Sequence, residues 1–352
     1  MIHLLKMFQS FYRTNGKTLL RLRTQRLNQN CTFISGFDNM KVTIVGGAGK
    51  IGKAVTLMLK QSPLIDEICL YDIKNTEGIA GELNHIDTNC KVTGFWGKHQ
   101  IGRALIGSKL VVILVSAPQC NDLSLSQDWN HSAKIVQEVV NDIYKYSPKA
   151  FLAIGTNPIN STVPLACALM KKNGIYNPNT IFGITTLDAV RANTFVARVL
   201  CIEPERVQVP VIGGHTEDTI VPVLSHTKPS AEFTNEELEN ITYNVKTAHD
   251  HMLSLNPAES APLASAFACA RFIISLVKAM KGYKDIIECA YVPSKVHPDV
   301  KYLSTPLLLG PYGISKNLGI PRLSEYERCI LDNAVNCLKD DISEGEKLAR
   351  AT

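Results

Sequence analysis

Three absences set the first limits on this chain of 352 residues. It has no uninterrupted apolar run of 18 residues, the length that a membrane-spanning helix requires, so we expect no transmembrane segment. Its ten cysteines form no C-x-x-C pair and no His–Cys cluster at metal-ligand spacing, so we expect no metal site. The sequence also has no internal repeat. With 45% hydrophobic and 20% charged residues, the composition is that of a globular protein long enough for two domains.

Acidic residues are missing from the amino-terminal segment. Residues 1–37 contain six Lys and Arg side chains but no Asp or Glu. Arginines mixed with Leu, Phe, Ser and Thr are typical of a mitochondrial transit peptide, so we expect residues 1–37 to direct the chain to the mitochondrial matrix. With Asp38 included, this segment has a net charge of +5, which equals the charge of the whole chain. The rest of the chain is neutral in sum, which argues against a nucleic-acid partner.

Strand and helix patterns alternate from Lys41 onward. The predicted strands are 41–45, 67–72, 111–115 and 150–154, and the predicted helices between them are 51–61 and 130–145. This alternation predicts an α/β domain with a parallel, doubly wound sheet over residues 40–185. Helical segments then mix with strand-like runs, which predicts an α+β domain over residues 186–350. No Pro- or Ser-rich linker separates the two, so we expect them to pack tightly.

A glycine-rich turn follows the first predicted strand. It has the sequence G-G-A-G-K-I-G, residues 46–52, and places Gly46, Gly49 and Gly52 three residues apart. Glycine lets the backbone approach a pyrophosphate, and the N-terminus of the following helix supplies free N–H groups, including those around Ile51. The strand before and the helix after the turn predict a dinucleotide-binding site.

Asp72 identifies the dinucleotide. It ends the second predicted strand, 20 residues beyond Gly52, where a carboxylate binds the hydroxyls of the adenine ribose and repels a 2′-phosphate. The sequence therefore predicts NAD rather than NADP. Lys50 and Lys53 stand in or beside the same turn, where they either attract the pyrophosphate or are solvated charges at the start of the helix.

Three residues form a candidate acid–base site. Asp188 and Arg191 are three residues apart and share a helix face, and His215 follows a strand-like run and two glycines. A carboxylate bonded to one imidazole nitrogen fixes the tautomer, and the other nitrogen can exchange a proton with a substrate hydroxyl. A nearby arginine can bind a carboxylate through two parallel hydrogen bonds. Spacing alone does not bring the three together, and a structural role for His215 is the alternative.

Four stretches resemble the lactate/malate dehydrogenase family, and within it malate dehydrogenases of the mitochondrial type. They are T-N-P-I-N-S-T (156–162), I-F-G-I-T-T-L-D-A-V-R-A-N-T-F (181–195), V-P-V-I-G-G-H (209–215) and S-T-P-L-L-L-G (304–310). The resemblance covers roughly residues 41–350. It implies an NAD-binding Rossmann domain, a catalytic domain and a homodimer. It further implies that His215 accepts the proton, Asp188 is its partner, Arg191 binds the C1 carboxylate of the substrate, and Asn157 lies near the nicotinamide and the substrate.

The predicted substrate loop departs from this family. Residues 114–132 contain no Lys or Arg. Gln119 stands where the family has the arginine that binds the far carboxylate of malate, and Leu125 stands where it has the arginine that polarises the reacting carbonyl. Ser132 replaces an asparagine that helps to hold the substrate. The further departures near the predicted site are Glu217, Asp218, Glu259, Pro262 and Ser265.

These losses leave three hypotheses. The first hypothesis is a malate dehydrogenase (malate + NAD to oxaloacetate + NADH) with weakened turnover. Turnover is expected to be weak because removing one preorganised donor to a developing oxyanion costs ~10²–10³ in rate. The second is an NAD-binding pseudoenzyme, acting as a structural matrix protein or as a partner in a mixed dimer. The third is a dehydrogenase of a different 2-hydroxy acid, because Gln119 resembles the residue of lactate dehydrogenases; these enzymes also keep the arginine that Leu125 replaces.

Overall fold

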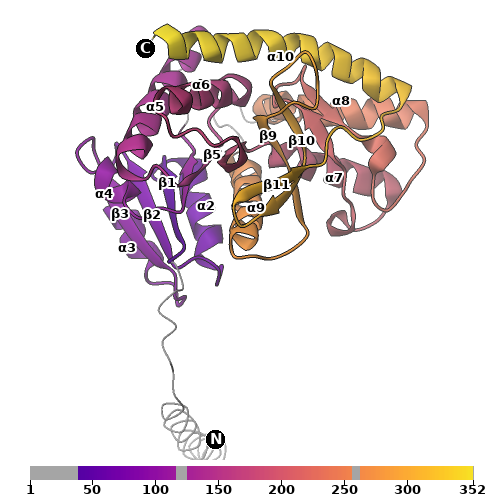
Figure 1. Cartoon of the computed structure of the whole chain (residues 1–352). Helices are drawn as coiled ribbons and strands as arrows, with labels where there is room; N and C mark the ends of the chain where they lie inside the picture. The colour runs from indigo at the N-terminus through magenta and orange to yellow at the C-terminus, as the bar shows by residue number, and fades with distance from the viewer. Residues whose placement is uncertain (1–38, 116–124, 256–261, 352) are drawn as a thin grey trace, which may run out of the picture. The chain divides into compact units, whose positions relative to one another are not determined.

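One mixed sheet of eleven strands runs through both halves of the described chain (Figure 1). This computed structural model describes residues 39–115, 125–255 and 262–351. The strands are β1 Lys41–Val45, β2 Glu67–Asp72, β3 Lys91–Trp96, β4 Leu110–Ile113, β5 Phe151–Ile154, β6 Ile181–Gly183, β7 Val211–Gly213, β8 Ile220–Pro222, β9 Ile286–Pro293, β10 Tyr302–Gly310 and β11 Gly313–Asn317. Their spatial order is β3-β2-β1-β4-β5-β6-β9-β10-β7-β8, and β11 pairs with β10.

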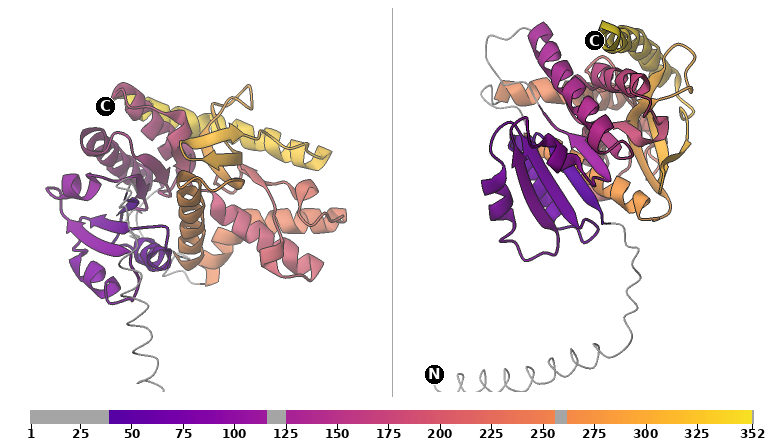
Figure 2. Two further views of the ribbon diagram at one scale, coloured as in Figure 1. Left: turned by 60° about the horizontal axis from the view of Figure 1, so that its bottom comes forward. Right: turned by 60° about the vertical axis from the view of Figure 1, so that its left-hand side comes forward.

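Helices cover both faces of the sheet (Figure 1, Figure 2). They are α2 Lys50–Lys60, α3 Glu77–Leu83, α4 Ile101–Leu105, α5 Leu125–Tyr146, α6 Ile159–Lys172, α7 Thr186–Leu200, α8 Asn235–Leu255, α9 Pro262–Met280 and α10 Glu325–Ala351, with 3-10 turns at Pro178–Thr180, Pro204–Arg206 and Leu224–His226. Val42 and Ile44 pack with α2, α3 and α9, whereas Val45 and Ile113 pack with α4, α5, α6 and α10. Successive strand residues thus face opposite layers, as in a sheet buried on both sides.

The parallel half of the sheet confirms the predicted α/β fold. Strands β1 to β6 are parallel in the order 3-2-1-4-5-6, which is typical of doubly wound dinucleotide-binding sheets. Val45 pairs with Ile113, and Ile113 pairs with Ile154, so the carboxyl ends of β1, β4 and β5 are level. The segments that follow these three strands therefore meet at one edge, where ligands bind in open α/β sheets.

The second half is the predicted mixture of strands and helices, and it continues the same sheet. Strand β6 joins the antiparallel strands through the pair Gly183–Tyr291. Helices α7 and α8 pack on β7 and β8 around a separate apolar cluster that includes Ala192, Val196 and Val245. No sequence signal near residue 186 indicated that a shared sheet would connect the halves. The domain limits 40–185 and 186–350 stay a prediction.

Several elements of the first half were missed in the sequence, and β3, α3 and α4 show why. Strand β3 lies at the edge of the sheet, contains Gly94 and leaves Trp96 exposed. Helices α3 and α4 have only seven and five residues. Glycine and partial exposure weaken the apolar alternation of an edge strand, and very short helices have too few turns for a clear periodicity.

Helix α9 is mostly apolar along its whole length. In the described part of the chain, it is the helix that is long and apolar enough to cross a membrane. Half of it is buried, and Phe272, Ile273 and Leu276 pack in the core beside α2. Ser265 and Arg271 interrupt its apolar sequence. We interpret α9 as a core helix.

Candidate functional site

The predicted phosphate-binding turn joins β1 to α2. Gly46 has a φ angle of +95°, which favours glycine, and a Cβ on it would lie 2.7 Å from the carbonyl oxygen of Leu114. A Cβ on Gly52 would lie 2.2 Å from the carbonyl oxygen of Gly46, so α2 packs directly on the turn. Gly49 is the N-cap of α2 and has no side chain to bond the first N–H groups. The other predicted cofactor residues in this turn of helix are the exposed Lys50 and the half-buried Ile51.

The carboxylate of Asp72 is anchored beside this turn. Its Oδ2 accepts a hydrogen bond of 3.0 Å from Ala48 N, and its Oδ1 accepts one of 3.1 Å from Lys74 N. Ile73, which the sequence analysis missed, is 71% exposed. An exposed isoleucine next to a ribose-binding carboxylate is a candidate for contact with the adenine ring. Glycine spacing, uncapped N–H groups and an oriented carboxylate together fit a dinucleotide of the NAD type.

The substrate loop begins beside Asn157. Asn157 is exposed at the carboxyl end of β5. Just before it, the hydroxyl of Thr156 accepts a hydrogen bond of 3.1 Å from Val115 N. This bond fixes Val115, the second residue after β4, next to the segment after β5. The predicted loop therefore starts at the edge of the sheet where the turns after β1 and β5 also lie.

The altered positions of the loop are only partly described. Gln119 lies outside the described residues, as does the side chain of Leu125 at the start of α5. Ser132 is 3% exposed on the same helix. Glu217 and Asp218 are exposed in a tight turn, where solvent and salt screen their charges. Of the remaining departures, Pro262 begins α9, Ser265 is half-buried one turn later, and Glu259 lies outside the described residues.

The structure brings His215 and Asp188 into contact. The distance from His215 Nδ1 to Asp188 Oδ2 is 2.6 Å, and the carboxylate is fully buried. Asp188 lies in the first turn of α7, where the helix dipole stabilises a negative charge. His215 lies two residues beyond β7 and its side chain is 13% exposed. With Nδ1 held by the carboxylate, Nε2 is the ring nitrogen left to exchange a proton, as a general base requires.

Arg191 lies one turn after Asp188 on α7 and is half-buried. Burial lowers the pKa of its guanidinium, and the charge of Asp188 opposes this shift. A guanidinium that has lost part of its hydration gains more from a bidentate carboxylate partner than a solvated one does. Arg191 therefore lies within electrostatic range of Asp188, and its guanidinium is suited to binding a carboxylate.

His249 is a further titratable residue near this group. Burial lowers its pKa, and the positive charges of Arg191 and His215 lower it further, while Asp250 raises it. His249 lies one turn after Val245, which is buried against α7, and its own side chain is exposed. The sequence analysis missed His249 because nothing in the pattern relates α8 to α7.

Asn160 is the third residue that the sequence analysis missed. It lies in the first turn of α6, three residues after Asn157, and is fully buried. Its Oδ1 accepts a hydrogen bond of 2.9 Å from the backbone N of His215. Asn160 thus holds the backbone of the residue whose ring contacts Asp188. The motif T-N-P-I-N-S-T contained this residue, but sequence alone did not connect it to His215.

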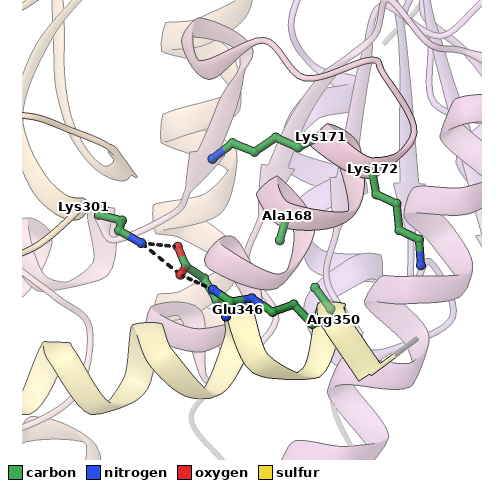
Figure 3. A pocket seen from close by; sticks show the side chains of 7 residues that line it. Ala168, Lys171, Lys172, Lys301, Glu346 and Arg350 are labelled. Atoms are coloured by element: carbon green, nitrogen blue, oxygen red, sulfur yellow. Dashed lines mark hydrogen bonds and ion pairs between the residues drawn. The ribbon is translucent and has the colours of Figure 1, made fainter.

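A separate cavity lies between α6 and α10 (Figure 3). It has a volume of about 470 Å³, and Figure 3 shows Lys171, Lys172, Lys301, Glu346 and Arg350 around it. Glu346 pairs with Lys301 at 3.1 Å and with Arg350 at 3.7 Å. Lys171 and Lys172 end α6, where cations offset the partial negative charge of a helix C-terminus. We infer that these charges stabilise the C-terminal ends of α6 and α10.

Comparison with known proteins covers nearly the whole chain. The family model for the lactate/malate dehydrogenase NAD binding domain matches residues 40–183, and the model for the alpha/beta C-terminal domain of the same family matches residues 185–349. The mitochondrial malate dehydrogenase of Bos taurus is 42% identical over 317 residues, which are 90% of this chain and 94% of that protein. That of Homo sapiens is 41% identical over the same shares of both chains.

Solved structures agree on the fold. A malate dehydrogenase from Cryptosporidium parvum has a TM-score of 0.76 at 24% identity, covering 88% of this chain and 99% of that one. A lactate dehydrogenase from the same organism also has a TM-score of 0.76, at 22% identity, covering 90% and 100%. At such identities the likeness concerns the fold, which both enzymes share. The two matched domains and the mammalian relatives show that this chain belongs to the lactate/malate dehydrogenase family of oxidoreductases, with NAD as the cofactor.

Proposed function

We propose that this chain is an NAD-dependent malate dehydrogenase whose turnover is weakened by the altered substrate loop. The observation that carries the proposal is the 2.6 Å contact between His215 Nδ1 and Asp188 Oδ2. The identity of 42% with a mitochondrial malate dehydrogenase supports malate and oxaloacetate as the substrate pair.

His215 is the proton acceptor in this proposal. Asp188 accepts the hydrogen bond from Nδ1–H, which leaves Nε2 to take the proton of the malate hydroxyl. Because Asp188 is fully buried, little solvent weakens its stabilisation of the imidazolium that results. Arg191 binds the C1 carboxylate, and Asn157 contacts the substrate from the end of β5. Bound NAD supplies the acceptor for the hydride that leaves C2.

The glycine turn holds the cofactor in this proposal. The N–H groups at the start of α2, from Lys50, Ile51 and Gly52, face the pyrophosphate, and Gly46 and Gly49 allow its close approach. Asp72 binds the adenine ribose. The amide of Asn157 lies near the nicotinamide, at the level edge of the sheet.

The substrate loop accounts for the weakened turnover. Gln119 and Leu125 replace both arginines that the resemblance places around the far carboxylate and the reacting carbonyl. One lost oxyanion donor costs about 10²–10³ in rate, and one lost arginine partner of a carboxylate costs roughly 2–5 kcal/mol. Together, these losses lower malate turnover by on the order of 10⁴ if they are partly additive.

The experiment that tests the proposal is NADH oxidation by the purified chain, with and without residues 1–37, using oxaloacetate and pyruvate in parallel. We expect slow but measurable turnover of oxaloacetate that disappears in the variant His215→Asn. NADH binding, followed by fluorescence, should be the same in both proteins. Fast oxaloacetate turnover would contradict the argument about the loop. Binding of NADH without turnover of either acid would instead support a pseudoenzyme, acting as a structural matrix protein or in a mixed dimer.

A second candidate follows from Gln119. An uncharged amide suits a substrate with an uncharged side chain, such as pyruvate, because no second carboxylate needs a cation. Preference for pyruvate over oxaloacetate in the same assay would make Gln119 the specificity residue. Because Leu125 replaces the arginine that polarises the reacting carbonyl, turnover of pyruvate should be slow as well.

Homodimerisation is part of the proposal. Helices α2 and α9 pack side by side (Figure 1) and leave large apolar side chains exposed. Leu57 on α2 is 47% exposed, and Leu263 and Phe267 on α9 are 69% and 52% exposed. Leu263 and Phe267 are four residues apart and share a helix face. Exposed apolar side chains on neighbouring helices support a protein–protein contact there.

Location in the mitochondrial matrix is also proposed. The mammalian relatives are mitochondrial enzymes, which supports the organelle. The predicted transit peptide, residues 1–37, lies outside the described residues. Import assays with isolated mitochondria, comparing the full chain with one that lacks residues 1–37, test it: only the full chain should become protected from external protease.

A further inference from the structure

A carboxylate on the last helix reaches the residue that holds His215. Asn160 Nδ2 donates a hydrogen bond of 2.9 Å to Asp341 Oδ2 on α10. Asn160 Oδ1 accepts the bond from the backbone N of His215, also at 2.9 Å. One buried amide therefore joins α10, at residue 341, to the segment after β7, at residue 215. The three residues come from elements far apart in the sequence.

The carboxylate determines which way the amide faces. An asparagine side chain can rotate by 180° and exchange its oxygen and nitrogen with little change in shape. An ionised Asp341 can only accept hydrogen bonds, so the NH₂ group of Asn160 must face it and the oxygen must face the N–H of His215. The hydroxyl of Thr216 can donate or accept, whereas that of Thr219 donates to the carbonyl oxygen of Thr216 and so accepts from the same NH₂ group, which supports this orientation.

The surroundings allow little adjustment. A Cβ on Gly214 would lie 2.6 Å from Asn160 Oδ1, so the backbone before His215 rests directly on the amide. A Cβ on Gly345, one turn after Asp341, would lie 2.2 Å from the carbonyl oxygen of Ser161. Helices α6 and α10 are therefore in backbone contact beside the carboxylate. A reversed amide would set a donor against the N–H of His215 in a space that cannot relax, leaving both unsatisfied.

We propose that Asp341 is a positioning residue for His215: by fixing the orientation of the Asn160 amide, it holds the backbone from which the imidazole reaches Asp188. The effect on catalysis rests on the proposed function. The effect on the backbone does not, and it can be measured separately.

The charge of Asp341 depends on its neighbours. Burial raises its pKa, the bond from Asn160 opposes the shift, and the charge of Asp340 adds to it. The charged and titratable groups around it are Asp340, Glu344 and Lys347 on α10, Tyr291 on β9, and His215 beyond Asn160. Once protonated, Asp341 can donate a hydrogen bond and no longer dictates the orientation of the amide. Acid should therefore loosen the segment that carries His215.

The variant Asp341→Asn separates orientation from packing. It keeps the shape of the side chain, but its own amide can present either an acceptor or a donor to Asn160, so position 341 no longer selects one orientation. The matched control is Asp340→Asn, which removes the same charge at the next, exposed position. Circular dichroism and NADH titration of the full chain check that both variants are folded.

Two readouts then test the proposal. Hydrogen exchange by mass spectrometry should rise about tenfold in the peptide over 211–219 in Asp341→Asn and stay unchanged in Asp340→Asn. The kcat of oxaloacetate reduction should fall about tenfold in Asp341→Asn with the KM for NADH unchanged, because the imidazole is misplaced and the cofactor turn is not touched. In the wild type, kcat should decline toward acid pH as Asp341 becomes protonated. This part of the decline should be absent in Asp341→Asn and present in Asp340→Asn.

The outcomes distinguish the two proposals. Unchanged exchange in Asp341→Asn overturns the positioning role, whatever the activity. Increased exchange in a chain without oxaloacetate activity upholds the positioning role and contradicts the proposed function. Equal effects in Asp341→Asn and Asp340→Asn would mean that the negative charge of α10 acts as a whole, which also overturns the role of the single residue.

Discussion

His215 and Asp188 are 27 residues apart in the chain, and their Nδ1 and Oδ2 atoms are 2.6 Å apart. Two different structural elements bring these atoms together. The first turn of α7 holds the carboxylate at its positive end, and the turn after β7 brings the imidazole to it. Asp188 Oδ1, in contrast, has no hydrogen-bond partner among the described residues. The imidazole is thus the one described group that satisfies this buried carboxylate, which couples the geometry of the pair closely.

The variant Asp188→Asn should lower oxaloacetate reduction by on the order of 10²–10⁴ with little change in NADH binding. The amide keeps the size of the side chain, but it can present a donor to Nδ1 and so favour the wrong tautomer, and it cannot stabilise an imidazolium. Steady-state kinetics and NADH fluorescence titration measure the two quantities. The control is Asp218→Asn, an exposed acid three residues after His215. A similar loss in both variants would mean that negative charge near the site matters more than the contact.

Restoring both arginines should raise oxaloacetate turnover. In the double variant Gln119→Arg with Leu125→Arg, we expect a gain on the order of 10² or more, because one cation binds the far carboxylate and the other stabilises charge on the carbonyl oxygen. Pyruvate, which lacks the second carboxylate, should gain less. The rates are measured by NADH oxidation with each acid.

A charge-matched control for this variant is Gln61→Arg with Leu318→Arg, two exposed positions outside the predicted site. It adds the same net charge and should leave both rates unchanged. If the control raised turnover as much as the loop variant, general attraction of the anionic substrate would explain the gain. Unchanged turnover in the loop variant would mean that activity was not lost through these two positions.

The sequence predicted the parts of the fold that have strong local signals. Strands such as Lys41–Val45 and Glu67–Asp72 are buried apolar runs, and the glycine spacing and Asp72 identified the turn after β1. The strand β3 was missed because Gly94 and its edge position weaken the pattern. Periodicity reports which face of one element is buried, and it does not report which elements lie side by side.

The contacts of the site were therefore less predictable than its residues. Asp188 and His215 were identified as candidates, but their meeting depends on how α7 packs against β7 and β8. Asn160 and Asp341 are 181 residues apart, and no local pattern relates them. His249 was missed for the same reason. Tertiary packing brings such residues together, and it is invisible in the spacing of a single sequence.

The variant Phe267→Glu should convert the proposed homodimer into monomers. A charged side chain on the exposed apolar face of α9 cannot be buried against a partner without a large desolvation cost. Light scattering after size-exclusion chromatography gives the mass. The control is Tyr312→Glu, at a side chain that is 87% exposed in the turn between β10 and β11, and it should leave the mass unchanged. A wild-type chain with a mass of 38.7 kDa would contradict the dimer itself.

His249 should make stability depend on pH. Burial and the charges of Arg191 and His215 lower its pKa in the folded state, whereas the unfolded chain has the ordinary value of about 6.5. The unfolded state therefore binds more protons between these two values, so the contribution to stability is complete above about pH 6.5 and is lost as the pH falls through the folded pKa. His249→Asn removes this contribution. The fall in Tm from about pH 7.5 to about pH 5 should then be smaller than in the wild type.

The matched control for this measurement is His251→Asn, a histidine two positions further along α8 that is also exposed. It should leave the pH dependence of Tm close to that of the wild type, because the charges of Arg191 and His215 that lower the pKa act on His249. A substrate anion bound at Arg191 would offset part of the positive charge that His249 meets. Saturating oxamate, an uncharged-side-chain analogue of pyruvate, should therefore reduce the difference between wild type and His249→Asn at acid pH. An identical pH profile in wild type and His249→Asn would show that the histidine is not near these charges.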